Sequence, residues 1–260
     1  MLACVDGVVM DAANATISVQ DEGLLRGDGV FEVIRVYGGT PFALDEHLQR
    51  MGRSAAILRL AFDESSVRGD AGALLAEGGP HDAALRLVVT RGGRRIALLE
   101  PLKVFPDTIS LATVTYSPTR VLDGVKSLSY GANMLATRLA KEAGAEEALL
   151  VSPHGRVLEG PTTSFFYVLG GELCTPPLSD RILDSISRRV LLEVTDARER
   201  VTTLDDLATI SEAFLASSLR EVMAVRSIDG RTLDAAPGPT AIDAAEKVSA
   251  YIEAAVHRQT

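Results

Sequence analysis

The sequence lacks the features that mark several classes of protein. It has two cysteines, Cys4 and Cys174, which stand far apart without CxxC spacing, so it predicts neither a disulfide framework nor a zinc site. The four histidines show no HExxH or paired-ligand spacing, so metal catalysis has no support. No segment approaches the roughly 18 consecutive apolar residues that a membrane-spanning helix needs. We therefore expect a protein without a metal centre and without membrane partners.

The charge balance argues against another class of partner. The 26 Lys and Arg residues stand against 35 Asp and Glu residues, for a formal net charge of −9, and no basic run is long enough to neutralise a phosphate backbone. Nucleic acid is not an expected partner. The opening MLACVDGVVM has no basic start, and an aspartate interrupts its apolar run, so we expect no export signal. A cytoplasmic location follows as an expectation, with both cysteines reduced and buried.

The sequence contains enough apolar residues, 47% of 260, to fill a sizeable core. Strand-like and helix-like segments alternate, with hairpin turns predicted at Asp6-Gly7 and Gly38-Gly39 and a helix capped by Asp45. The segment 117–124 contains proline and glycine without periodicity, which is typical of a linker. This predicts a two-domain α+β or α/β protein, with domains at 1–116 and 125–260.

Two charged residues lie at the ends of predicted elements, where sites tend to be built. Lys126 comes just before a predicted helix and Glu159 just after a predicted strand. The ordinary explanation for each is a solvated surface charge. For Lys126 this explanation is somewhat weaker, because cations favour the C-terminus of a helix.

Three short polar segments admit two interpretations each. The segment DSIS, 184–187, can simply cap the helix that follows, or its free N–H groups and the Ser187 hydroxyl can bind a phosphate. The turn SSLR, 217–220, can likewise be a structural feature alone or a phosphate site. In HLQR, Arg50 is either on the wet face of a helix or a bidentate phosphate ligand.

Taken in order, these motifs resemble one family over almost the whole chain, the class IV or fold-type IV pyridoxal-phosphate (PLP) enzymes. Its members include D-amino-acid transaminases, branched-chain aminotransferases and aminodeoxychorismate lyases. The resemblance implies a two-domain α/β (α+β) fold, with a small N-terminal domain and a larger C-terminal pseudo-barrel domain, and a homodimer. The motifs that carry it are RGDGVFEVIRVYGG, HLQRMGRSA, VKSLSYGANMLA, GAEEALLVSPHGRVLEG, LCTPPL and ILDSISRR.

The resemblance also implies roles for individual residues. Lys126 would form the Schiff base with PLP and move the substrate proton, because desolvation and a cationic neighbour lower the pKa of such an amine. Glu159 would pair with the pyridine nitrogen and keep it protonated, so that the ring can accept electrons. The phosphate would be bound by Arg50, by the Ile186 and Ser187 N–H groups, and by Ser218.

The sequence departs from the family pattern at five positions. Serines stand at 185 and 187 where many relatives have Gly and Thr, and Ser164 stands where an asparagine is usual. Phe31 replaces the tyrosine of D-amino-acid transaminases. Tyr130 lies four residues after Lys126, whereas branched-chain enzymes carry a tyrosine five places after their lysine. A contact of Tyr130 with the cofactor therefore stays open.

The substrate depends on pocket residues rather than on the shared machinery. Arg94 and Arg95 stand where relatives present an arginine to the substrate carboxylate, although a basic surface turn explains them equally well, and Arg86 is a weaker candidate. Leu219 is expected to shape the side-chain pocket, and the Ser218 and Leu219 N–H groups are further candidates for the carboxylate.

The motifs GDGVFEVIRVYGG and KSL are most similar to the D-amino-acid transaminases. The preferred prediction is therefore transfer of an amino group between a D-amino acid, or a related (R)-amine, and a 2-oxoacid. An aminodeoxychorismate lyase, which forms 4-aminobenzoate and pyruvate, is the second alternative. A branched-chain L-amino-acid aminotransferase is the third, and a cofactor-free binding protein with the same fold is the alternative outside the enzymes.

Overall fold

The computed structural model describes residues 1–258 as two compact units, each of which has its own sheet. The first unit contains Met1–Val104, Val125–Tyr130 and the residues from Ile252 onward. The second unit contains Phe105–Gly124 and Gly131–Tyr251. The chain therefore passes between the units more than once.

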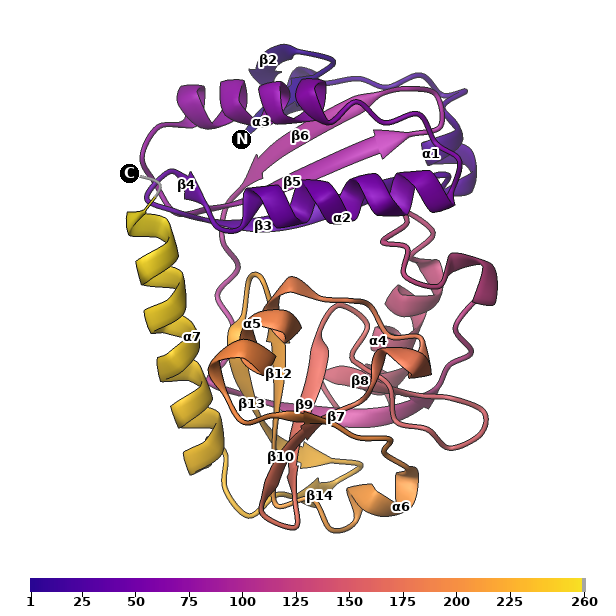
Figure 1. The fold of residues 1–260 in the computed structure, drawn as a ribbon. Helices are drawn as coiled ribbons and strands as arrows, with labels where there is room; N and C mark the ends of the chain where they lie inside the picture. Colours follow the sequence, from indigo (N-terminus) through magenta and orange to yellow (C-terminus); the bar gives the residue numbers. More distant parts are fainter. Residues whose placement is uncertain (259–260) are drawn as a thin grey trace. The chain divides into compact units, whose positions relative to one another are not determined.

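The first unit is built on a six-stranded antiparallel sheet in the order β2-β1-β6-β5-β3-β4. Two helices, α2 and α3, lie along this sheet (Figure 1). Its elements are β1 (Leu2–Val5), β2 (Val8–Asp11), α1 (Glu22–Arg26), β3 (Gly29–Tyr37), β4 (Thr40–Pro41), α2 (Leu44–Ile57), α3 (Glu64–Gly78), β5 (Ala83–Thr90) and β6 (Arg95–Glu100), with a 3₁₀ turn at Ala12–Asn14.

Both predicted hairpins of this unit are confirmed. Asp6 and Gly7 have φ angles of 50° and 89°, and Gly38 and Gly39 have φ angles of 54° and 92°. Two consecutive left-handed residues are what a tight turn between right-twisted strands requires, and Gly and Asp accept that conformation readily. The predicted Asp45 cap is wrong, because α2 begins at Leu44 and Asp45 lies within its first turn.

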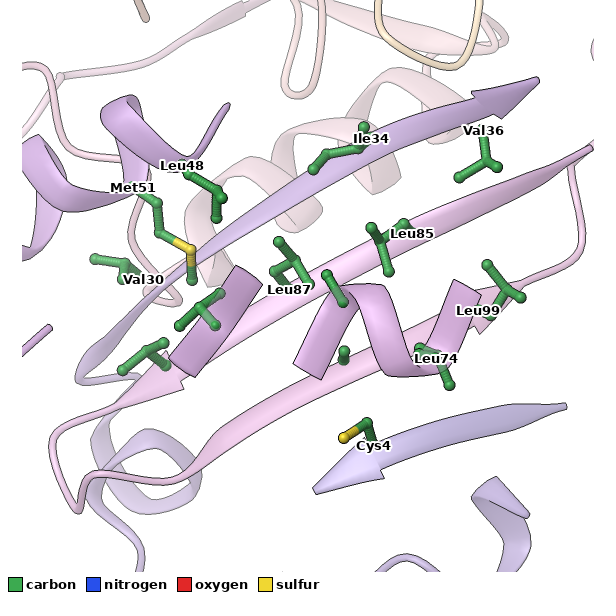
Figure 2. Close-up of a cluster of buried hydrophobic side chains, with 14 of the residues drawn as sticks. Cys4, Val30, Ile34, Val36, Leu48, Met51, Leu74, Leu85, Leu87 and Leu99 are labelled. Carbon is green, nitrogen blue, oxygen red and sulfur yellow. The ribbon is translucent and has the colours of Figure 1, made fainter. Parts of the chain in front are cut away.

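Alternation along β3 determines which side chains enter the core of the first unit. Val30, Ile34 and Val36 point into a buried apolar cluster with residues of β5, β6, α2 and α3, as Figure 2 shows. Glu32 shares this parity and is fully buried among them. Phe31 alternates with these residues and therefore points to the opposite face of the sheet.

The second unit is built on an eight-stranded mixed sheet in the order β11-β10-β9-β12-β13-β7-β8, with β14 paired to β13. Helix α5 packs on β12. The elements are β7 (Thr108–Thr115), α4 (Gly131–Glu142), β8 (Glu147–Val151), β9 (Ser164–Leu169), β10 (Glu172–Thr175), α5 (Ile186–Val194), β11 (Arg198–Glu199), α6 (Leu204–Leu207), β12 (Glu212–Ser217), β13 (Glu221–Ile228) and β14 (Arg231–Thr232), with 3₁₀ turns at Arg120–Leu122 and Leu178–Asp180. Helix α7 (Pro239–His257) begins in this unit, and its last turns, from Ile252, belong to the first unit.

The second sheet curls so that strands far apart in its order come together. Glu147, the first residue of β8, lies 3.4 Å from the Thr163 hydroxyl, which immediately precedes β9. This curvature agrees with the pseudo-barrel expected for the larger domain. Along its core, the rings of Phe166 and Phe214 stack with centroids 5.2 Å apart.

The domain boundaries expected from the sequence differ from the two compact units. Strand β7, placed in the 1–116 domain, pairs with β13 and β8 and so belongs to the second sheet. The segment Val125–Tyr130, placed in the C-terminal domain, packs with the first unit. The expected linker at 117–124 belongs to the second unit and contains a 3₁₀ turn. Strand pairing places β7 in the second sheet and joins Ser127 to Val30 of β3, and a strand's partner cannot be read from its own composition.

Within residues 1–258, no helix combines the length and the hydropathy that a membrane span requires.

Candidate functional site

Lys126 lies in an extended segment that pairs with β3. The Phe31 N–H donates to the Lys126 carbonyl at 3.2 Å, and an isolated bridge joins Val30 to Ser127. The Lys126 N–H donates to the hydroxyl of Ser54, on α2, at 3.1 Å. Both backbone groups of Lys126 are thus hydrogen-bonded, so the direction of its side chain is set by the sheet and by α2.

Two aromatic rings surround the amine of Lys126. Its Nζ lies 4.4 Å from the centroid of Phe31 and 5.7 Å from that of Tyr130. The two rings meet edge to face with centroids 5.1 Å apart. The structure therefore brings together three residues that the sequence singled out separately. The faces of the two rings contact the amine and help to fix its position.

On the opposite face of β3, Glu32 is the centre of a buried polar cluster. Its carboxylate accepts from Arg50 Nε at 2.7 Å and from Arg50 Nη2 at 2.6 Å, and His47 Nδ1 lies 2.7 Å from it. Glu32 and His47 are fully buried and Arg50 is 5% exposed. The guanidinium fork that the sequence assigned to a phosphate is thus occupied by Glu32. The sequence alone did not predict this pairing, because Glu32 and Arg50 lie on different elements.

The cluster shifts the pKa values of two of its members. Burial alone would raise the pKa of Glu32, but the charge and hydrogen bonds of Arg50, with a further hydrogen bond from His47, lower it from 4.5 to about 2. Burial lowers the pKa of His47 below its ordinary value of 6.5, which outweighs its bond to Glu32. At neutral pH the cluster therefore contains a carboxylate, a guanidinium and a neutral imidazole.

The pKa shifts of Glu32 and His47 predict how the free energy of unfolding depends on pH. Because the folded-state pKa of Glu32 lies below its unfolded value, its contribution is present above pH 4.5 and is lost between pH 4.5 and about 2. The expected loss is on the order of 3 kcal/mol. The contribution of His47 is lost earlier, as the pH falls below 6.5. Urea unfolding at a series of pH values measures both.

A Glu32→Gln variant separates this effect from general acid sensitivity. It should be less stable at pH 7 by about 3–5 kcal/mol, because it breaks a buried ion pair, and its stability should fall less steeply below pH 4.5. Glu22→Gln, which removes a surface partner of Arg26, is the matched control and should follow the wild type. Equal slopes for Glu32→Gln and the wild type below pH 4.5 would contradict the assignment.

The structure does not place Arg94 or Arg95 beside the Lys126 amine. Arg94 pairs with Asp6 at 2.5 Å. Arg95 pairs with Asp70 of α3 at 2.8 Å, so its side chain lies on the helix-covered face of the sheet, opposite Phe31. In contrast, Arg86 is the cross-strand neighbour of Val33 and shares the Phe31 face by alternation.

The second unit brings Glu159 to the segment that leads into α5. Its Oε1 accepts from the Leu183 N–H at 3.1 Å. The Tyr116 phenol is close enough for Glu159 to affect it: burial raises the pKa of Tyr116, and the negative charge of Glu159 raises it further. Glu159 is therefore an oriented carboxylate and not a loose strand-end charge.

The start of α5 is capped as one of the two interpretations predicted, and it also has the N–H groups that the phosphate interpretation requires. Ser185 is the N-cap, and its hydroxyl accepts from the Arg188 N–H at 3.4 Å. Among residues 1–258, no acceptor is found for the Ile186 and Ser187 N–H groups, which belong to the first helical turn. Such groups at a helix N-terminus favour an anion.

Ser218 and Leu219 lie in the turn between β12 and β13, where Ser217 pairs with Glu221. Strands β9 and β12 are neighbours, with Ser164 opposite Ala216, so this turn and the loop after Glu159 end at the same edge of the sheet. The Ser164 hydroxyl, at the position where relatives have asparagine, is buried without a hydrogen-bond partner in the described chain.

The donor set fits PLP in its chemistry. The second unit offers helix N–H groups and hydroxyls for a phosphate and a carboxylate for a protonated ring nitrogen, and the first unit offers an amine for the aldehyde. The candidate residues are divided between the units: Phe31, Arg50, Arg94, Arg95, Lys126 and Tyr130 in the first, and Glu159, Ile186, Ser187, Ser218 and Leu219 in the second.

Comparison with known proteins identifies the class to which this fold and these residues belong. The model of the amino-transferase class IV family matches residues 29–228, and the chain is a member of that family. It is a PLP-dependent class IV aminotransferase.

Three relatives carry names that differ in substrate. A putative branched-chain-amino-acid aminotransferase of Methanocaldococcus jannaschii is 34% identical, over 88% of each chain. A D-alanine aminotransferase of Bacillus licheniformis is 31% identical, over 90% of this chain and 91% of its own. A bifunctional aminodeoxychorismate lyase / D-amino acid transaminase of Mycobacterium tuberculosis is 27% identical, over 91% of this chain and 94% of its own.

Solved structures confirm the fold-type IV architecture over the whole chain. The PLP-bound form of a hypothetical aminotransferase from Mycobacterium tuberculosis superimposes with a TM-score of 0.88 at 28% identity, covering 98% of this chain and 99% of the other. The fold IV-transaminase CpuTA1 from Curtobacterium pusillum superimposes with a TM-score of 0.88 at 27% identity, covering 100% and 99%.

Proposed function

We propose that this aminotransferase transfers the amino group of a D-amino acid to a 2-oxoacid, with Lys126 as its catalytic residue. The observation that carries the proposal is the placement of the Lys126 amine, fixed through both backbone groups and enclosed by the rings of Phe31 and Tyr130. A lysine whose only task is solubility needs neither constraint.

When bound, PLP supplies an aldehyde that binds an amine and a ring that accepts the electrons left by proton removal. Lys126 would hold the cofactor covalently at rest. It would then take the proton from the substrate Cα and deliver it to the cofactor carbon C4′. Glu159 would hold a proton on the ring nitrogen. Ile186, Ser187 and Ser218 would anchor the phosphate.

Arg50 has a modified role in this proposal. Its Nε and Nη2 atoms are bonded to Glu32. A phosphate bound by Arg50 would therefore meet a guanidinium that Glu32 holds in a fixed orientation. Arg94 and Arg95 are engaged with Asp6 and Asp70. Arg86, on the Phe31 face, is likewise engaged, with Glu100 at 2.9 Å. The candidates for the substrate carboxylate are therefore the Ser218 and Leu219 N–H groups.

The preference for D-amino acids rests on the GDGVFEVIRVYGG and KSL motifs and on relatives named D-alanine aminotransferase. The branched-chain alternative is supported by the name of the 34% identical relative. The lyase alternative is supported by the bifunctional relative, which also shows that a single class IV protein can be named for both reactions.

One experiment distinguishes these alternatives. The holoenzyme is mixed in turn with D-alanine, L-leucine and aminodeoxychorismate, and the absorbance of the bound cofactor and the products are followed. We expect D-alanine to change the spectrum rapidly and to yield pyruvate. A rapid response to L-leucine with none to D-alanine would overturn the D-amino-acid assignment, and release of 4-aminobenzoate would establish the lyase.

We further propose that the protein works as a homodimer in the cytoplasm. The dimer is supported by the family resemblance, and the reducing compartment by Cys4 and Cys174, which are both free and buried. Light scattering after size-exclusion chromatography tests the dimer, which should have twice the chain mass of 27.6 kDa.

A further inference from the structure

A second buried ion pair lies in the larger unit, beside the residues proposed to bind the phosphate. Arg220 Nη1 lies 2.5 Å from Glu147 Oε2, with the two side chains 14% and 6% exposed. The contact is one of charge rather than an aligned hydrogen bond. The Arg220 guanidinium also lies 5.0 Å from the centroid of Phe105. Two charges are seldom removed from water without a structural reason, since the desolvation penalty is large.

The pair connects the turn that presents Ser218 to the loop that follows Glu159. Arg220 belongs to the Ser217–Glu221 turn, which presents Ser218 and Leu219. Glu147 Oε1 lies 3.4 Å from the Thr163 hydroxyl, in the loop that begins at Glu159. The loop packs tightly there, because a Cβ at Gly160 would lie 2.1 Å from the Thr163 hydroxyl and 3.3 Å from Glu147 Oε1.

The turn itself has a conformation that needs support. Glu221 has a φ of 54°, in the left-handed region that a residue with a long side chain rarely adopts. Such strain persists where surrounding contacts over-determine the backbone. The contacts that hold this turn include the hydrogen bond that the Arg220 N–H donates to the Ser217 hydroxyl at 3.3 Å, and the ion pair with Glu147.

We propose that Glu147 and Arg220 are positioning residues, which hold the strained turn so that Ser218 meets the phosphate of PLP. They act through the turn and do not touch the cofactor. The proposal rests on the assignment of Ser218 to the phosphate. It predicts that the pair matters for PLP and not for pyridoxal, which has the same aldehyde and ring but no phosphate.

The test uses the full chain freed of cofactor and titrated with PLP or pyridoxal, followed by absorbance. In a Glu147→Gln/Arg220→Met double variant, neither charge is left unpaired. We expect its dissociation constant for PLP to rise about tenfold and that for pyridoxal to stay unchanged. Arg220→Lys retains the charge but loses the guanidinium, and should shift PLP affinity in the same direction. If the double variant does not fold, the Arg220→Lys variant still tests the proposal.

The matched control is the exposed Arg226–Glu146 pair of the same unit, where Glu146→Gln/Arg226→Met should bind both ligands as the wild type does. Wild-type PLP affinity in the double variant and in Arg220→Lys would overturn the proposal, as would an equal loss for PLP and pyridoxal. A wild-type chain that binds PLP no better than pyridoxal would instead overturn the phosphate site itself.

Discussion

A Lys126→Ala variant is expected to lose transaminase activity by about 10⁴-fold or more. A general base alone contributes about 10²–10⁴-fold, and Lys126 is proposed also to hold the cofactor covalently. The structure holds this amine in place through the hydrogen bond of the Lys126 N–H to Ser54 and the contacts of Nζ with the rings of Phe31 and Tyr130, and alanine has no amine to offer there.

The measurement should separate loss of chemistry from loss of fold. After reduction with borohydride, mass spectrometry should find the mass of PLP on the wild-type peptide that contains Lys126, and on no peptide of the variant. Lys103→Ala, an exposed lysine of the same unit, is the control and should retain both label and activity. Residual turnover within tenfold of the wild type in Lys126→Ala would show that another group carries the proton.

Local chemistry was predictable from the sequence where a few neighbouring residues decide it. The Asp6-Gly7 and Gly38-Gly39 turns need left-handed residues, and the sequence places permissive residues at all four positions. The Ser185 cap of α5 likewise lies in the segment DSIS, for which the sequence predicted a helix cap. Each of these features depends on residues within one turn of the chain.

Features that depend on distant partners were not predictable in this way. α2 begins one residue before the expected Asp45 cap, after Ala43 at a φ of 56°. The helix that contains Arg50 was predicted correctly. Its partner Glu32 lies on β3, however, and only the packed structure shows that the Arg50 guanidinium binds the Glu32 carboxylate. Lys126 was identified through family motifs. Its contacts with Phe31 and Tyr130 depend on the packing of Val125–Tyr130 beside β3, which the sequence does not show.

Glu159→Gln is expected to lower kcat by about 10²–10³-fold while leaving PLP attached to Lys126. Losing one electrostatic partner of a developing charge costs about this much in other enzymes, and an amide cannot hold a proton on the ring nitrogen as a carboxylate does. Glu159 is oriented by the Leu183 N–H, so glutamine can keep the hydrogen bond through its amide oxygen and lose only the charge. The borohydride label should therefore persist at Lys126 as activity falls, unlike in Lys126→Ala.

An optical measurement tests the same charge without turnover. The negative charge of Glu159 adds to burial in raising the pKa of Tyr116, so removing that charge should lower the pKa of Tyr116, while the burial contribution remains. Ultraviolet titration of the phenol, with Tyr116→Phe to identify its signal, measures the shift. Glu142→Gln, an exposed carboxylate at the end of α4, should change neither the titration nor kcat. If Glu159→Gln moves the Tyr116 titration yet retains full kcat, the carboxylate is present and oriented but does not serve the cofactor, and the proposed pairing with the ring nitrogen is wrong.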